Sequence, residues 1–231
     1  MLANTKKYVV IAVAIAIVIG VVGSGLSYIN QVEQQAQNNQ DLGQTLTVKV
    51  PPVLGSETAS VTIIEMGDYQ CEMCKRWNDN TRPKIIENFI DTGKANLVFI
   101  DLPILGPDSH TAAEATYCAD DQGKYWDYHL TLYDYQDHMN SGWANAERLK
   151  AFAFGLGLSM NEFEECLDSG KYKQHVKLNL QKAKSGGANS TPTFIIVNAA
   201  GDQKQIRGAQ PYSIFEPVSY THLTLPTNRE V

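Results

Sequence analysis

Short apolar runs alternate with longer amphipathic segments along the chain, and this pattern predicts a mixed α/β domain. Val61–Met66 is apolar and β-branched, as is typical of a buried strand. The segment 75–90 has apolar residues at helical spacing, with Pro83 expected to interrupt it near residues 80–82, and 96–102 is again strand-like. A strand, a helix and a strand in this order predict a βαβ unit with a right-handed crossover.

A block of helical segments follows this unit, and two more strands follow the block. Helices are expected at residues 110–118, 125–135, 143–155, 159–167 and 172–183, the fourth beginning with a Ser-x-x-Glu capping box at Ser159. Strands are expected over 190–197, with Pro192 near the start, and over 203–207, and a short edge strand at 46–50 before a loop at 54–59. Two strands on each side of the block predict one sheet, with the block (about 108–185) inserted into it.

The N-terminal pattern predicts a membrane anchor. Residues 8–29 form 22 positions without a charge, long enough to span a bilayer, and Lys6 and Lys7 precede them. This arrangement predicts a single-pass protein of the cell membrane, with residues 1–7 cytoplasmic and the rest outside. Residues 30–45, rich in Gln and Asn, are expected to form a polar linker. A cleaved signal peptide is the alternative; in both cases the domain lies in an oxidising compartment.

The C-terminal segment has a different character from the rest. Pro211 could open a last helix, but residues 217–231 show no helical periodicity, and we interpret them as a non-native tail. Elsewhere, composition excludes some functions. A net charge of −6 argues against a nucleic-acid surface. The five histidines show no metal-ligand spacing, so neither a metal nor a cofactor is expected.

The chemistry is expected at Cys71-Glu72-Met73-Cys74, which lies between the first predicted strand and the helix after it. Free backbone N–H groups at a helix N-terminus stabilise a thiolate, so Cys71 is expected to be the nucleophile and Cys74 its sheltered partner. Half of a zinc site is an alternative, although zinc needs four ligands and usually a second close pair. A purely structural disulfide is another.

Four segments in this order resemble DsbA-like thiol–disulfide oxidoreductases, which are thioredoxin-fold proteins with a helical insertion. They are residues 68–74, 115–126, 166–172 and 190–194, and the resemblance covers about 53–215. It implies that 46–216 is a DsbA-like thioredoxin domain.

The implied function is the introduction of disulfides into exported proteins with free cysteines, by exchange at Cys71 and Cys74. A membrane quinone-linked protein of the DsbB or vitamin K epoxide reductase type would reoxidise the pair. Reduction or isomerisation of disulfides at the same site is an alternative, as is a non-catalytic domain that binds peptides.

The resemblance also assigns roles to residues outside the motif. It implies a cis bond between Thr191 and Pro192, beside the cysteines, where Thr191 would pair with an extended substrate; an ordinary trans proline is the alternative. It implies that Glu65 is buried below the site and exchanges protons with Cys74, unless it points to solvent.

The two residues between the cysteines depart from the strongest oxidants of the family, which carry a histidine there. Glu72 disfavours a thiolate at Cys71 and Met73 adds no charge, so a milder oxidant is expected.

Cys118 and Cys166 both fall in the helical block. Two free thiols are not expected in an oxidising compartment, so a disulfide between them is predicted, with two buried free cysteines as the alternative.

Overall fold

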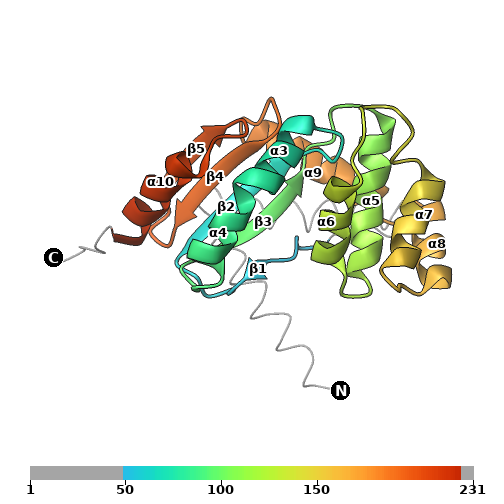
Figure 1. Cartoon of the computed structure of the whole chain (residues 1–231), viewed down its shortest axis with the longest axis horizontal. Helices are drawn as coiled ribbons and strands as arrows, with labels where there is room; N and C mark the ends of the chain where they lie inside the picture. The colour runs from blue at the N-terminus through green and yellow to red at the C-terminus, as the bar shows by residue number, and fades with distance from the viewer. Residues whose placement is uncertain (1–48, 225–231) are drawn as a thin grey trace, which may run out of the picture.

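A five-stranded sheet lies at the centre of the computed structural model, which describes residues 49–224 (Figure 1). Its strands, in the order in which they neighbour one another, are β1 (Leu54–Gly55), β3 (Ala95–Asp101), β2 (Val61–Gly67), β4 (Thr193–Asn198) and β5 (Gln203–Arg207). Only β2 and β3 are parallel, from Val61 opposite Ala95 to Gly67 opposite Asp101. The predicted βαβ unit and the single sheet are both confirmed.

The N-terminal edge strand differs from the prediction. The observed strand is β1, in residues that were expected to form a loop. It pairs with β3, with Leu54 opposite Leu97, and Leu54 packs against the apolar core that includes Leu97. Lys49 and Val50 belong to no strand, and residues 46–48 lie outside the described part of the chain.

The helix between β2 and β3 is broken, as the proline predicted. It consists of α3 (Glu72–Asn80), α4 (Arg82–Ile85) and a π-helical turn, η1 (Ile86–Ile90). Thr81 separates the first two pieces, and Pro83 lies in the first turn of α4, where its missing N–H costs nothing. The Thr81 hydroxyl donates a hydrogen bond to the Gln210 carbonyl at 3.0 Å, which holds this break against the segment before α10.

Helices cover both faces of the sheet. On one face, α3, α4 and α10 (Tyr212–Thr224) pack over β2 and β4 through Trp77, Phe194 and Phe215, with ring centroids 4.6–5.8 Å apart. On the other, α9 (Lys173–Ser185) lies against β3.

The remaining helices form the predicted insertion at one end of the sheet (Figure 1). They are α5 (Pro107–Asp120), α6 (Tyr125–Asp134), α7 (Ala146–Gly155) and α8 (Met160–Asp168). Their apolar faces meet in a second core that includes Tyr117, Tyr128 and Phe163, all fully buried. Trp126 packs against both cores and so joins the insertion to the sheet.

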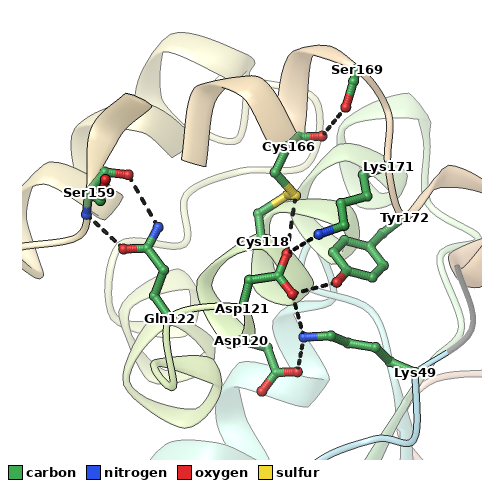
Figure 2. A network of polar contacts seen from close by, with 10 residues as sticks. All are labelled: Lys49, Cys118, Asp120, Asp121, Gln122, Ser159, Cys166, Ser169, Lys171 and Tyr172. Atoms are coloured by element: carbon green, nitrogen blue, oxygen red, sulfur yellow. Dashed lines mark hydrogen bonds and ion pairs between the residues drawn. A yellow bond between two sulfur atoms is a disulfide. The ribbon is translucent and has the colours of Figure 1, made fainter. Parts of the chain in front are cut away.

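The predicted capping box of α8 is wrong, although the helix itself is present. The Ser159 side chain makes no capping hydrogen bond. Instead the Gln122 side chain bridges to the Ser159 backbone, accepting from its N–H at 2.7 Å and donating to its carbonyl at 3.2 Å (Figure 2). An amide from a neighbouring loop therefore replaces the local cap.

Cys118 and Cys166 form a disulfide that joins α5 to α8, as predicted. Beside it, the Asp121 carboxylate forms ion pairs with Lys49 and Lys171, each at 2.8 Å, and accepts a hydrogen bond from the Tyr172 hydroxyl at 2.6 Å (Figure 2). The first described residue is thus held against the insertion next to its covalent crosslink.

The last helix corrects another prediction. α10 continues through Pro217 to Thr224, where no helical periodicity was expected. The fully buried Phe215 packs on Trp77 and Phe194, and Ser219 is also buried, so contacts with the sheet favour the helix despite the proline. The interpretation of residues 217–231 as a non-native tail stays a prediction.

The predicted anchor and linker, residues 8–29 and 30–45, lie outside the described residues. Among residues 49–224, no helix has both the length and the apolar character that a membrane crossing requires.

Removing the disulfide should destabilise the fold without touching the active site. For Cys118→Ala with Cys166→Ala we expect a loss of about 4 kcal/mol in the free energy of unfolding, because the bond closes a long loop in the unfolded chain. Urea unfolding of both proteins measures this loss. A change below about 1 kcal/mol would show that the crosslink adds little.

Candidate active site

The Cys71 sulfur lies at the N-terminus of α3, where it serves as the cap. Cys71 has extended backbone angles, and its sulfur accepts a hydrogen bond from the Cys74 backbone N–H at 3.3 Å. On its other side the Cys71 sulfur lies 3.5 Å from the Thr191 carbonyl oxygen, to which Cys71 donates a hydrogen bond when it is protonated. Both cysteines are free thiols and both are buried, Cys74 completely.

These contacts separate the acidities of the two thiols. The pKa of Cys71 is lowered to about 6, chiefly by a hydrogen bond from the Cys74 side chain. The pKa of Cys74 is raised well above its usual value, because burial disfavours its charged form and it donates to Cys71. At neutral pH, Cys71 is therefore the thiolate and Cys74 the protonated partner.

The Thr191–Pro192 bond is cis, as predicted, and lies beside the cysteine pair. Pro192 immediately precedes β4, and its carbonyl accepts from the Gly208 N–H at 2.8 Å, across the turn from β5. The two predicted substrate-binding residues are thus brought to Cys71 by the end of a central strand, although they are far from it in sequence.

Glu65 is buried in the middle of β2, so the alternative of a solvent-facing side chain is wrong. It lies between Phe99 of β3 and Phe194 of β4, and only 1% of the residue is exposed. Burial raises the pKa of Glu65 to about 8, while the positive charge of Arg82 lowers it and the Cys71 charge raises it. A carboxyl group that changes charge near neutral pH therefore lies below the cysteine pair.

Arg82 was missed by the sequence analysis. It is a buried cation in α4 whose charge acts on Glu65, and its guanidinium carbon lies 5.9 Å from the Trp126 ring centroid. The only local signal was its place next to Pro83, which predicted a helix break and said nothing about which way the arginine points.

Asp68 holds the turn before Cys71. Its buried carboxylate accepts three backbone N–H groups, from Gln70 at 2.8 Å, Ile104 at 2.8 Å and Leu105 at 3.0 Å. One side chain thereby ties the active-site turn to the loop between β3 and α5. Asp68 was part of the motif that carried the resemblance, but no role had been assigned to it.

Glu72 and Met73, the predicted redox-tuning residues, occupy the first turn of α3 and are exposed. Neither side chain contacts the Cys71 sulfur through a hydrogen bond in the described structure. Over residues 49–224, no three His, Cys, Asp or Glu side chains gather in a way that could hold a metal ion.

A sequence model described as thioredoxin matches residues 47–213, which contain the sheet, the cysteine pair and the insertion. The chain belongs to the thioredoxin family. Among relatives, disulfide bond formation protein D of Bacillus subtilis (strain 168) is 29% identical over 163 residues, covering 69% of this chain and 73% of that protein.

Solved structures agree with this assignment. BdbD from Bacillus subtilis in its oxidised form superposes with a TM-score of 0.69 at 27% identity, covering 76% of this chain and 94% of that one. Wolbachia pipientis alpha-DsbA1 shares the fold, with a TM-score of 0.67, 23% identity and coverage of 77% and 94%. Together with the acidities of Cys71 and Cys74, these findings identify the chain as a DsbA-like thiol–disulfide oxidoreductase.

The buried Glu65 should make stability depend on pH. Its pKa is about 8 in the folded protein against an ordinary 4.5, so its contribution to stability is complete below about pH 4.5 and is lost as the pH rises through 8. Glu65→Gln cannot ionise. Between about pH 5 and pH 8.5, the original protein should lose on the order of 2–4 kcal/mol more than the variant.

Urea unfolding at the two pH values measures this difference. Asp101, a buried carboxyl group whose pKa is raised to about 6, titrates in the same window, so the comparison with the variant is needed to isolate Glu65. Parallel stability profiles for the two proteins would contradict the assignment.

Proposed function

We propose that the chain introduces disulfides into exported proteins that carry free cysteines. The observation that carries this proposal is the unequal acidity of Cys71 and Cys74. Because the reduced form holds a stabilised thiolate, the disulfide form has a tendency to accept electrons and to pass its bond to a substrate. The name of the Bacillus subtilis relative, disulfide bond formation protein D, supports the same direction.

The reaction begins with the oxidised enzyme, in which Cys71 and Cys74 are joined. A substrate thiolate attacks the Cys71 sulfur, a mixed disulfide forms and Cys74 leaves. The second thiolate of the substrate then attacks the substrate sulfur in the mixed disulfide. Cys71 leaves as a thiolate, which the N-terminus of α3 stabilises, so the substrate gains one disulfide and the enzyme gains two electrons.

Glu65 supplies the proton that Cys74 needs when it leaves. Its raised pKa, near 8, means that the carboxyl group holds a proton at neutral pH and can give it up at little cost. The raised pKa of Cys74 makes its thiolate, formed as it leaves, a strong proton acceptor. During reoxidation the same proton returns to Glu65.

Substrates bind as extended peptides at Thr191 and Pro192. The Thr191 carbonyl already lies 3.5 Å from the Cys71 sulfur, so a peptide paired with the Thr191 backbone would lie with its own cysteine at the site of attack. Pairing through backbone groups does not depend on the substrate sequence, which suits an enzyme acting on many proteins.

The domain works outside the cytoplasm, tethered by residues 8–29 as a single-pass membrane anchor, with residues 30–45 as the linker. Each turnover leaves the enzyme reduced, so an oxidant must restore it. We assign this step to a membrane quinone-linked protein of the DsbB or vitamin K epoxide reductase type, which an anchored enzyme would meet in the plane of the bilayer.

Substitution of either cysteine should separate the two steps. Cys71→Ser should abolish oxidation of a reduced, unfolded substrate protein. Cys74→Ser should remove catalytic disulfide transfer and let a mixed disulfide between Cys71 and a thiol accumulate, visible by mass spectrometry without reductant. Removal of Cys118 and Cys166 together is the matched control and should leave the transfer intact. Full activity of Cys71→Ser would exclude this mechanism.

The reduction potential of the pair should lie between that of thioredoxin, about −270 mV, and that of the strongest oxidants of the family, about −120 mV. The Cys71 pKa of about 6 lies between the values typical of those two classes. Glu72→His should shift the potential toward the oxidising end, because it replaces a negative charge near the thiolate.

A glutathione titration of the original protein and the variant measures both quantities. An unchanged potential in Glu72→His would refute the tuning role of this position. A potential near about −270 mV in the original protein would instead favour a reductase.

A further inference from the structure

Gln136 belongs neither to the cysteine motif nor to the proline loop, yet its side chain reaches the backbone of the active-site turn. It lies just after α6 in the helical insertion. Its amide nitrogen donates to two carbonyl oxygens, that of Tyr69 at 2.5 Å and that of Cys71 at 3.2 Å. The two carbonyls belong to the residues on either side of Gln70, in the turn that leads into α3.

The loop that carries Gln136 is fixed to the same turn at a second point. The Asn140 backbone N–H donates to the Gln70 side-chain oxygen at 2.8 Å, and the buried Gln70 amide donates in return to Asn140 Oδ1 at 3.4 Å. Gly106 completes the contact, because a Cβ at that position would lie 2.5 Å from Asn140 Oδ1. Gln136 is therefore presented by a loop with a defined position.

We propose that Gln136 is a positioning residue for thiol–disulfide exchange, whose side-chain amide orients the turn so that the Cys71 sulfur stays at the cap of α3. This inference rests on the proposed exchange at Cys71. The Cys71 carbonyl also accepts the Lys75 N–H at 3.1 Å, the first backbone hydrogen bond of the helix, so Gln136 acts on the peptide group that begins α3.

The Gln136 side-chain amide stabilises the Cys71 thiolate in two ways. Holding the Tyr69 and Cys71 carbonyls keeps the sulfur aligned with the Cys74 N–H, its donor at 3.3 Å. The N–H hydrogens of Gln136 also place partial positive charge against two partially negative oxygens near the sulfur, which reduces their repulsion of a thiolate. Both effects favour the thiolate form of Cys71, and hence the reduced enzyme.

The test compares three substitutions in the full-length chain. Gln136→Ala removes both hydrogen bonds, Gln136→Glu puts a carboxylate against the two carbonyls, and Gln136→Lys keeps a donor and adds positive charge. The readouts are the pH dependence of Cys71 alkylation by iodoacetamide, located by mass spectrometry, and the equilibrium with glutathione. Gln122→Ala is the control, since Gln122 also bridges a backbone N–H and carbonyl, but within the insertion.

In Gln136→Ala we expect the ionisation constant of the Cys71 thiol to fall about three- to tenfold, with a matching shift of the glutathione equilibrium toward the disulfide form. Gln136→Glu should lower it further, and Gln136→Lys should keep it within about twofold of the original or raise it. Gln122→Ala should change neither quantity.

Values for Gln136→Ala and Gln136→Glu within about twofold of the original would overturn the proposal, since each hydrogen bond should change the ionisation by more. An equal fall in Gln122→Ala would also overturn it, because the effect would then come from a loosened insertion. So would an equal fall in Gln136→Lys, which would indicate a packing role alone. Absence of exchange with glutathione in the original protein would refute the proposed function instead, while alkylation of Cys71 would still report on Gln136.

Discussion

The central constraint on this domain is the position of one sulfur atom at the N-terminus of a helix. There it faces backbone N–H groups that have no carbonyl partner within the helix. The Cys74 N–H, 3.3 Å from the Cys71 sulfur, is useful only if the turn before α3 stays in register with the helix. The parallel strands β2 and β3 bring that turn to one edge of the sheet, and β4 brings the Thr191 carbonyl to its other side. The sheet thus positions the groups that surround the Cys71 sulfur.

Two buried carboxyl groups near this atom show how environment decides the role of a residue. The Asp68 carboxylate accepts hydrogen bonds from three backbone N–H groups. These hydrogen bonds satisfy the buried carboxylate and join the active-site turn to the loop after β3. Glu65, three residues earlier, lies between Phe99 and Phe194 of the neighbouring strands, and burial raises its pKa to about 8 although the charge of Arg82 lowers it. The first is suited to holding structure and the second to exchanging a proton.

Local patterns predicted most of this architecture, because the signals involved are local. The apolar run of β2, the interruption near Pro83 and the cysteine motif at a strand–helix junction each depend on a few neighbouring residues. The features that the sequence did not predict are either too short to show a pattern or depend on contacts between residues far apart in the chain. β1 is too short to show periodicity, and α10 continues past Pro217 because Phe215 is buried against residues far away in sequence. Gln136 reaches a carbonyl 67 residues away, and no spacing rule could indicate such a partner.

The contacts of Lys49 also determine where the chain enters the described domain. Its ion pairs with Asp120 and Asp121 fix the entering backbone to the C-terminal end of α5, beside the bond between Cys118 and Cys166. The position at which the chain enters the described domain is therefore set by the insertion, which the disulfide crosslinks, and not by the edge strand β1.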